Sequence, residues 1–155
     1  MPRILAFDAS STNVGYCLGD SGQYFTSGVF SPKGKAHDRV TQIAFWTIQI
    51  ITETRPEAIA IEEPAGDHGN RKTDRLLAGV WWSIYTVAVL QGIRRVIRVW
   101  PSQVKKTKIH KGTTRQAALY AGKPKVGEDE ADAIGVWLAA EAKLNAELLK
   151  KRAKE

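Results

Sequence analysis

The stretch Ile4-Leu5-Ala6-Phe7-Asp8-Ala9-Ser10 opens the chain with a short apolar run that ends in a carboxylate and small polar residues. The apolar run predicts a buried strand, and residues 9–13 are typical of a turn. Residues 14–18 and 24–30 predict two further strands, with a tight glycine-containing turn at 19–22 between them. Three short antiparallel strands are therefore expected at the start of the fold.

Helical spacing replaces the strand pattern after His37, where apolar residues recur at intervals of three and four until Pro56. Residues 58–61 then form an apolar run without alternation, which is typical of a strand buried on both faces, and Glu62 follows it. The remaining predicted elements are a helix at about 73–91, a strand at 95–100, a brief helix at 113–120 and a last helix from Glu128.

This order predicts one α/β domain over residues 1–155, with a charged tail from about residue 143. Its central sheet should be mixed, an antiparallel meander followed by parallel strands, with helices on its flanks.

Composition and charge narrow the class of protein. The chain has 155 residues and a formal net charge of +7, which favours an anionic partner such as nucleic acid. Cys17 is the single cysteine, so an intrachain disulfide is excluded and a reducing cytosol is expected. The sequence has neither a signal-peptide pattern nor an apolar run long enough to cross a bilayer. We therefore expect a cytoplasmic protein.

Four carboxylates occupy positions at which ligands gather in α/β folds. Asp8 and Glu62 end strands, and Asp129 and Asp132 lie three residues apart on one face of the last helix. Taken singly, Asp8 is also explained as a turn residue and the helical acids as charges that complement the helix dipole. Carboxylates that converge repel one another, and hard divalent cations relieve that repulsion. Oxygen ligands favour Mg²⁺ or Mn²⁺ over zinc, and two such ions can hydrolyse a phosphodiester.

Three acidic segments, 4–10, 59–64 and 129–134, resemble in sequence and order the motifs of the RuvC family of Holliday-junction resolvases, which includes phage-type members. The resemblance spans roughly residues 3 to 140. It implies an RNase H-like fold, a homodimer, and cleavage of four-way DNA junctions by symmetric nicks with Mg²⁺. Carried over by position, it implies that the metal-binding and catalytic residues are Asp8, Glu62, Asp129 and Asp132, with two cations per active site. Glu63 is the rival of Glu62, and Glu130 is expected to be solvent-exposed.

One departure from the family concerns the residues after the central glutamate. Bacterial members carry an aromatic residue there that resembles a wedge against a base, whereas residues 64–68 here contain no Phe or Tyr. His68 is the remaining candidate for that role. A broad, structure-directed cleavage preference is therefore expected.

The stretch from Gly92 to Gly127 contains no Asp or Glu and is rich in lysine and arginine. Such one-sided charge next to the last acidic motif predicts contacts with DNA phosphates. A second basic segment follows Glu62, and the first turn adds one polar residue. The predicted DNA-binding residues are Ser10, Arg71, Lys72, Arg75, Lys105, Lys106, Lys108, Lys111 and Arg115.

The predicted helix at about 73–91 is apolar around most of its circumference, so it is either buried in the monomer or part of a subunit interface. The resemblance favours a dimer, with Leu77, Trp81 and Tyr85 at the contact. Trp46, Trp100, Trp137 and Cys17 are predicted to lie in the core, and a zinc site at His37 or His110 is not expected.

Two other functions remain open from the sequence. An RNase H-like nuclease of the YqgF-like group would keep the fold and the metals but act on RNA. A non-catalytic nucleic-acid-binding module would use the acids structurally, although clustered negative charge does not help such a module to bind phosphates.

Overall fold

A computed structural model describes residues 2–10, 12–20, 25–64 and 71–154. Its strands are β1 (Arg3–Ala9), β2 (Val14–Asp20), β3 (Phe25–Phe30), β4 (Ala58–Glu62) and β5 (Arg95–Val99). Its helices are α1 (Ala36–Thr54), α2 (Arg71–Leu90), α3 (Pro101–Lys106), the short 3₁₀ helix η1 (Lys111–Thr113), α4 (Thr114–Ala121) and α5 (Glu128–Arg152).

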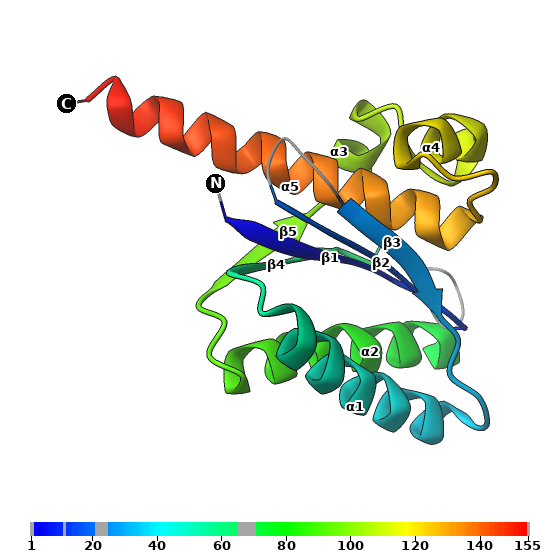
Figure 1. Ribbon diagram of the computed structural model, residues 1–155. Coiled ribbons are helices and arrows are strands. Elements are labelled where there is room, and N and C mark those ends of the chain that lie inside the picture. The colour runs from blue at the N-terminus through cyan, green and yellow to red at the C-terminus, as the bar shows by residue number, and fades with distance from the viewer. Residues whose placement is uncertain (1, 11, 21–24, 65–70, 155) are drawn as a thin grey trace.

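The five strands form one sheet in the order β3-β2-β1-β4-β5. The β1–β2 and β2–β3 pairs are antiparallel, and the β1–β4 and β4–β5 pairs are parallel. Helices α1 and α2 cover one face of the sheet, whereas α5, with α3 and α4 beyond it, covers the other (Figure 1). The predicted mixed sheet, a meander followed by parallel strands with helices on both sides, is confirmed.

Each face of the sheet buries its own apolar cluster, because successive side chains of a strand point to opposite faces. Ile4 and Ala6 of β1 pack toward α5 with Trp137, whereas Leu5 and Phe7 pack toward α1 and α2. This double burial explains why the strand from Ile4 to Phe7 reads as a continuous apolar run rather than an alternating one.

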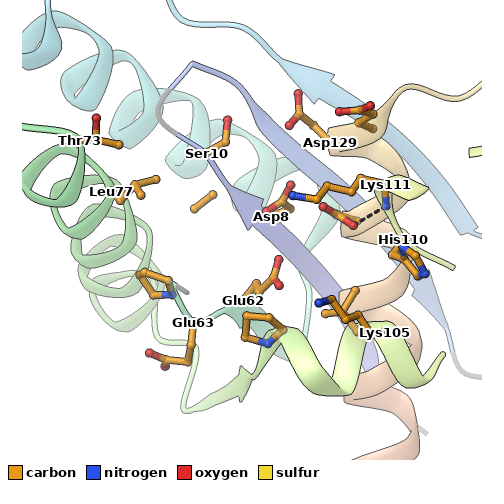
Figure 2. Close-up of a pocket in the computed structure, with 16 residues that line it drawn as sticks. Asp8, Ser10, Glu62, Glu63, Thr73, Leu77, Lys105, His110, Lys111 and Asp129 are labelled. Atoms are coloured by element: carbon orange, nitrogen blue, oxygen red, sulfur yellow. Dashed lines mark hydrogen bonds between the residues drawn. The ribbon is translucent and has the colours of Figure 1, made fainter. Parts of the chain in front are cut away.

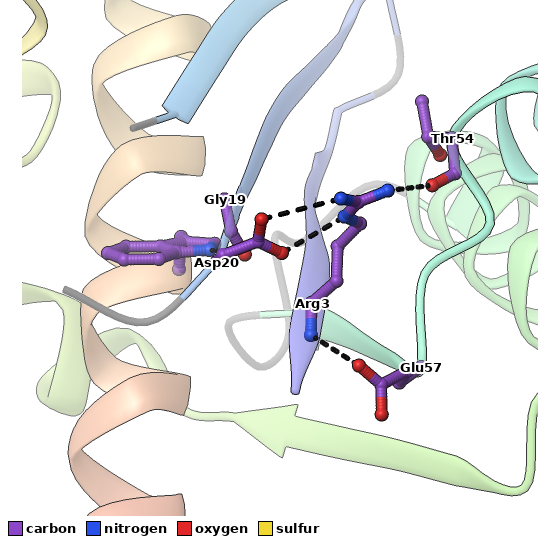
Figure 3. Close-up of polar contacts among 6 residues, drawn as sticks. Arg3, Gly19, Asp20, Thr54 and Glu57 are labelled. Atoms are coloured by element: carbon purple, nitrogen blue, oxygen red, sulfur yellow. Dashed lines mark hydrogen bonds and ion pairs between the residues drawn. The ribbon is translucent and has the colours of Figure 1, made fainter. Parts of the chain in front are cut away.

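Arg3 stabilises the end of the sheet at which β1 begins. Its Nε donates to Asp20 Oδ1 at 3.0 Å, its Nη1 to the Thr54 carbonyl at 3.0 Å, and its backbone N–H to Glu57 Oε1 at 3.2 Å (Figure 3). These contacts join the start of β1 to the end of β2 and to the segment that follows α1. Asp8 lies at the opposite end of β1, which forms part of the candidate site.

Several sequence predictions differ from the structure. The last helix, α5, runs through the charged segment from about residue 143 as far as Arg152. The second helix begins at Arg71 instead of about residue 73. Trp100 is half exposed rather than in the core, because it follows the last residue of the edge strand β5. Trp137 and Cys17 are buried as predicted. Among the described residues, no helix has the length and apolar character needed to cross a bilayer.

Candidate functional site

The carboxyl ends of β1 and β4 bring Asp8 and Glu62 together. Phe7 is paired in register with Ile61, so the residue after each occupies the same edge of the sheet. Figure 2 shows the two carboxylates pointing toward one another. The sequence prediction that these acids share one end of neighbouring parallel strands agrees with this arrangement.

Close packing of α5 on the sheet adds Asp129 and Asp132 to this edge. Gly15, which is paired with Asp8 across β1 and β2, faces the backbone of Asp129. A Cβ atom at Gly15 would lie 2.0 Å from the Asp129 carbonyl oxygen, so any side chain there would push the first turn of α5 away. The glycine therefore lets the helix present its acids to Asp8.

Asp8, Glu62 and Asp132 form the tightest group of acids. One carboxylate oxygen from each lies within 4.8 Å of the others. Asp132 is held in place by the segment before α4, because its Oδ1 accepts a hydrogen bond from the Lys111 backbone N–H at 2.6 Å. Three partly buried carboxylates are thus assembled from one strand end each of β1 and β4 and from the first turns of α5.

The electrostatics of this group favour a bound cation. Burial raises the pKa of Asp8 well above its usual range, and the charges of Glu62 and Asp132 raise it further. Burial, followed by the charge of Asp132, raises the pKa of Glu62 to about 7. Burial also raises the pKa of Asp132. A donor set made only of carboxylate oxygens, each costly to ionise alone, fits a hard divalent cation such as Mg²⁺ or Mn²⁺.

Asp129 lines the same cleft but is held by different contacts. The Asn13 side-chain amide donates to Asp129 Oδ2 at 3.1 Å, and Ser31 Oγ donates to Asn13 Oδ1 at 2.8 Å. The Ser10 hydroxyl closes the same turn, since it donates to the Asn13 carbonyl at 2.7 Å and accepts from the Asn13 N–H at 3.0 Å. The first turn thereby fixes the orientation of Asp129 relative to Asp8.

The two acids that neighbour predicted ligands point elsewhere. Glu63 is buried and forms an ion pair with Arg98, and Figure 2 shows its carboxylate directed away from that of Glu62. Glu130 is also buried, so the prediction that it is solvent-exposed is wrong. Its Oε1 accepts from Ser27 Oγ at 2.6 Å and pairs with Lys123, because that side of α5 packs against β3.

A cleft of about 480 Å³ surrounds the carboxylates. Residues from the basic stretch line one side of it, namely Lys105, His110 and Lys111, and Thr73 and Leu77 of α2 line another. The Lys111 side chain reaches toward Asp8 (Figure 2), and its charge lowers the pKa of both Glu62 and Asp132 against the larger effect of burial.

Apart from Ser10, the other predicted DNA-binding residues lie on exposed surface outside the lining of this cleft. Lys106 ends α3 and Lys108 follows it, whereas Arg115 is in the first turn of α4. Arg71, Lys72 and Arg75 occupy the first turns of α2. Ser10 lines the cleft, with its hydroxyl engaged in the turn. His68, the candidate wedge, lies outside the described residues.

The predicted dimer-contact residues take three different positions on α2. Leu77 lines the cleft, Trp81 is only 7% exposed and packs in the core beneath the helix, and Tyr85 is partly buried against Trp81. Trp82 instead projects outward, with 58% of its surface exposed. The helix therefore buries one face, which contains Val80, Trp81, Ile84, Val87 and Ala88, and leaves the opposite face exposed.

Sequence reasoning missed Asn13 and His110 as members of the site. Asn13 reads as an ordinary turn residue, and its link to Asp129 spans 116 positions of the chain, so no local pattern indicates it. His110 has no partner at metal-ligand spacing in the sequence, yet it lines the cleft that contains Asp132.

Comparisons with known proteins identify the fold. No protein family model and no curated protein matches the chain. Among solved structures, it is similar to Thermus thermophilus RuvC in complex with a Holliday junction substrate, with a TM-score of 0.76 and 19% identity over 94% of this chain and 95% of that chain. A structure of Thermus thermophilus RuvC gives a TM-score of 0.70 and 19% identity, covering 94% of this chain and 96% of that chain.

The yeast mitochondrial Holliday junction resolvase Ydc2 is similar as well, with a TM-score of 0.62 and 13% identity over 93% of this chain and 80% of that chain. These likenesses extend over nearly the whole chain. The predicted fold is therefore confirmed: this chain has the RNase H-like fold of the RuvC resolvases.

Proposed function

We propose that this protein is a metal-dependent endonuclease that resolves Holliday junctions and related branched DNA. The observation that carries the proposal is the convergence of Asp8, Glu62 and Asp132, within 4.8 Å of one another, in a cleft bordered by a lysine-rich segment. The structural neighbours named above act on such junctions, and their fold is shared along nearly the full length of this chain.

In this proposal Asp8, Glu62, Asp129 and Asp132 hold two Mg²⁺ ions, with Mn²⁺ as a substitute. When bound, the ions would supply an activated water and neutralise charge at the scissile phosphate. Asn13 keeps Asp129 oriented, and the Lys111 backbone N–H keeps Asp132 oriented. The Lys105 and Lys111 ammonium groups, on the same side of the cleft, would attract the phosphate backbone toward the carboxylates.

The direct test is incubation of the protein with a synthetic four-way junction, a linear DNA duplex of the same sequence and an RNA–DNA hybrid, each in Mg²⁺ or in EDTA. We expect paired symmetric nicks in the junction alone and only with Mg²⁺. Cleavage of the hybrid with an intact junction would favour an RNA-directed nuclease instead. Binding without cleavage of any substrate in Mg²⁺ or Mn²⁺ would favour a non-catalytic module.

We place the activity in the cytoplasm of a bacterium or of a phage-infected host.

Removing basic side chains near the cleft should weaken junction binding in a salt-dependent way. For the double variant Lys105→Ala and Lys106→Ala, we expect the slope of log K against log salt to fall by about 0.9 for each phosphate that the protein no longer neutralises. Fluorescence anisotropy over a salt series measures this slope. The matched control is Lys151→Ala, since Lys151 is exposed in the last turn of α5, about 28 Å along the helix axis from Asp132. An unchanged slope in the double variant would mean that these lysines serve solubility alone.

A homodimer would place two such sites on opposite strands of a junction. The outer face of α2 carries exposed apolar side chains suited to this contact, namely Trp82, Val89 and Leu90. We expect Trp82→Glu to shift the protein toward the monomer mass of 17.1 kDa, as measured by light scattering. Leu149→Glu, a similar change on the exposed end of α5, should leave the dimer intact. A wild-type protein that is already monomeric at micromolar concentration would refute the dimer.

A further inference from the structure

Trp100 is a large aromatic side chain held half in solvent at the end of β5. The residue is 50% exposed, although hydrogen bonds hold its backbone. The Trp100 N–H donates to Gln103 Oε1 at 2.9 Å, and the Trp100 carbonyl accepts from the Gln103 N–H at 2.8 Å as α3 begins. An exposed tryptophan on a rigid backbone loses little conformational entropy when a flat ligand stacks on it.

A cation between two rings supports Trp100 from behind. The Arg98 guanidinium carbon lies 5.8 Å from the ring centroid of Trp100 and 5.9 Å from that of the buried Trp81. Glu63, itself buried, forms an ion pair with the same guanidinium. Trp81, Arg98 and Trp100 thus form a layered arrangement of ring, cation and ring that extends from the core to the surface.

The layered arrangement stands at the catalytic edge of the sheet. Glu62 is paired in register with Val99, and the Glu63 N–H donates to the Val99 carbonyl at 2.7 Å. Trp100 is therefore the residue that follows the strand partner of Glu62, and the next residue, Pro101, lines the cleft. A planar group stacked on Trp100 would therefore lie at the same edge of the sheet as Glu62, next to the residue with which the lining of the cleft begins on α3.

We infer that Trp100 is a stacking platform for an unstacked nucleic-acid base next to the cleaved phosphate. Nucleobases are the planar groups that a phosphodiester substrate brings to this edge, and every base offers a face for stacking. In continuous duplex the base faces are covered by their neighbours, so the platform favours DNA whose stacking is interrupted, as at a branch point. The inference rests on the proposed function and assigns a base-binding subsite to it.

The test compares Trp100→Leu with Trp100→Phe. Leucine keeps an apolar side chain but has no aromatic face, whereas phenylalanine retains one. Binding is measured in EDTA, so that no cleavage occurs, on a four-way junction that carries 2-aminopurine at the crossover nucleotides and on the linear duplex. For Trp100→Leu we expect junction binding to weaken roughly 5- to 150-fold, with the 2-aminopurine fluorescence left unquenched. Trp100→Phe should keep most of both signals, and duplex binding should not change in either variant.

Phe45→Leu is the matched control, because Phe45 is an exposed aromatic residue of α1 and should contribute nothing to the junction signal. Wild-type affinity and quenching in Trp100→Leu would overturn the inference, while junction cleavage by the wild type would still support the proposed function. Equal loss in the Leu and Phe variants, or a monomer mass for Trp100→Leu beside a dimeric wild type, would also overturn it, because Trp100 would then be a packing or subunit contact.

Discussion

Replacing Asp8 with Asn is expected to lower junction cleavage by more than about 100-fold while leaving junction binding equal or stronger. Loss of a residue that only supports a metal ligand already costs about 10- to 100-fold, and Asp8 is proposed as a ligand itself. The substitution keeps the shape of the side chain but removes a negative charge from the centre of the carboxylate group. That charge also repels DNA phosphates, so binding does not suffer.

The measurement is single-turnover cleavage of a labelled four-way junction in Mg²⁺, with binding followed separately in EDTA. Glu62→Gln should behave like Asp8→Asn, because its carboxylate belongs to the same group. Glu63→Gln is the informative neighbour. Its side chain is paired with Arg98 and directed away from the carboxylate of Glu62, so cleavage should persist. Normal cleavage by Glu62→Gln together with an inactive Glu63→Gln would show that the assignment on β4 is wrong.

The sequence predicted those parts of the fold and site that depend on local pattern. The uninterrupted apolar runs before Asp8 and Glu62 indicated buried strands, and the spacing of Asp129 and Asp132 indicated one face of a helix. Because parallel strands align their carboxyl ends, these patterns also implied that the acids would meet. The close group of Asp8, Glu62 and Asp132 agrees with that reasoning.

Contacts between segments far apart in the chain were beyond local pattern. Glu130 was expected in solvent because its side chain would point away from that of Asp129. The packing of α5 against β3 instead buries it beside Ser27 and Lys123. Trp100 was expected in the core because its sequence neighbourhood indicates an apolar face, yet it follows the edge strand β5 and is half exposed. Both errors concern what lies opposite a side chain, and only the tertiary fold determines that.

In the absence of divalent cations, the protein should become less stable as the pH rises from about 5 to 8. The pKa of Glu62 is raised to about 7 in the folded protein, against an ordinary value near 4.5 when the chain is unfolded. Between these two values the folded state binds more protons than the unfolded state, so the free energy of unfolding falls as the pH increases. The raised pKa of Asp8 acts in the same direction. The expected loss is on the order of a few kcal/mol.

Urea denaturation at several pH values, in EDTA and in Mg²⁺, measures this effect. Since a cation binds the deprotonated carboxylates, Mg²⁺ should restore stability at pH 8 and have little effect at pH 5. Asp8→Asn removes one of the repelling charges. In EDTA, the free energy of unfolding of this variant should therefore exceed that of the wild type by an amount that grows as the pH rises. Glu53→Gln, a change at an exposed carboxylate of α1, should follow the wild-type curve at every pH. A difference in the free energy of unfolding between Asp8→Asn and the wild type that is constant from pH 5 to 8 would mean that these carboxylates do not repel one another as proposed.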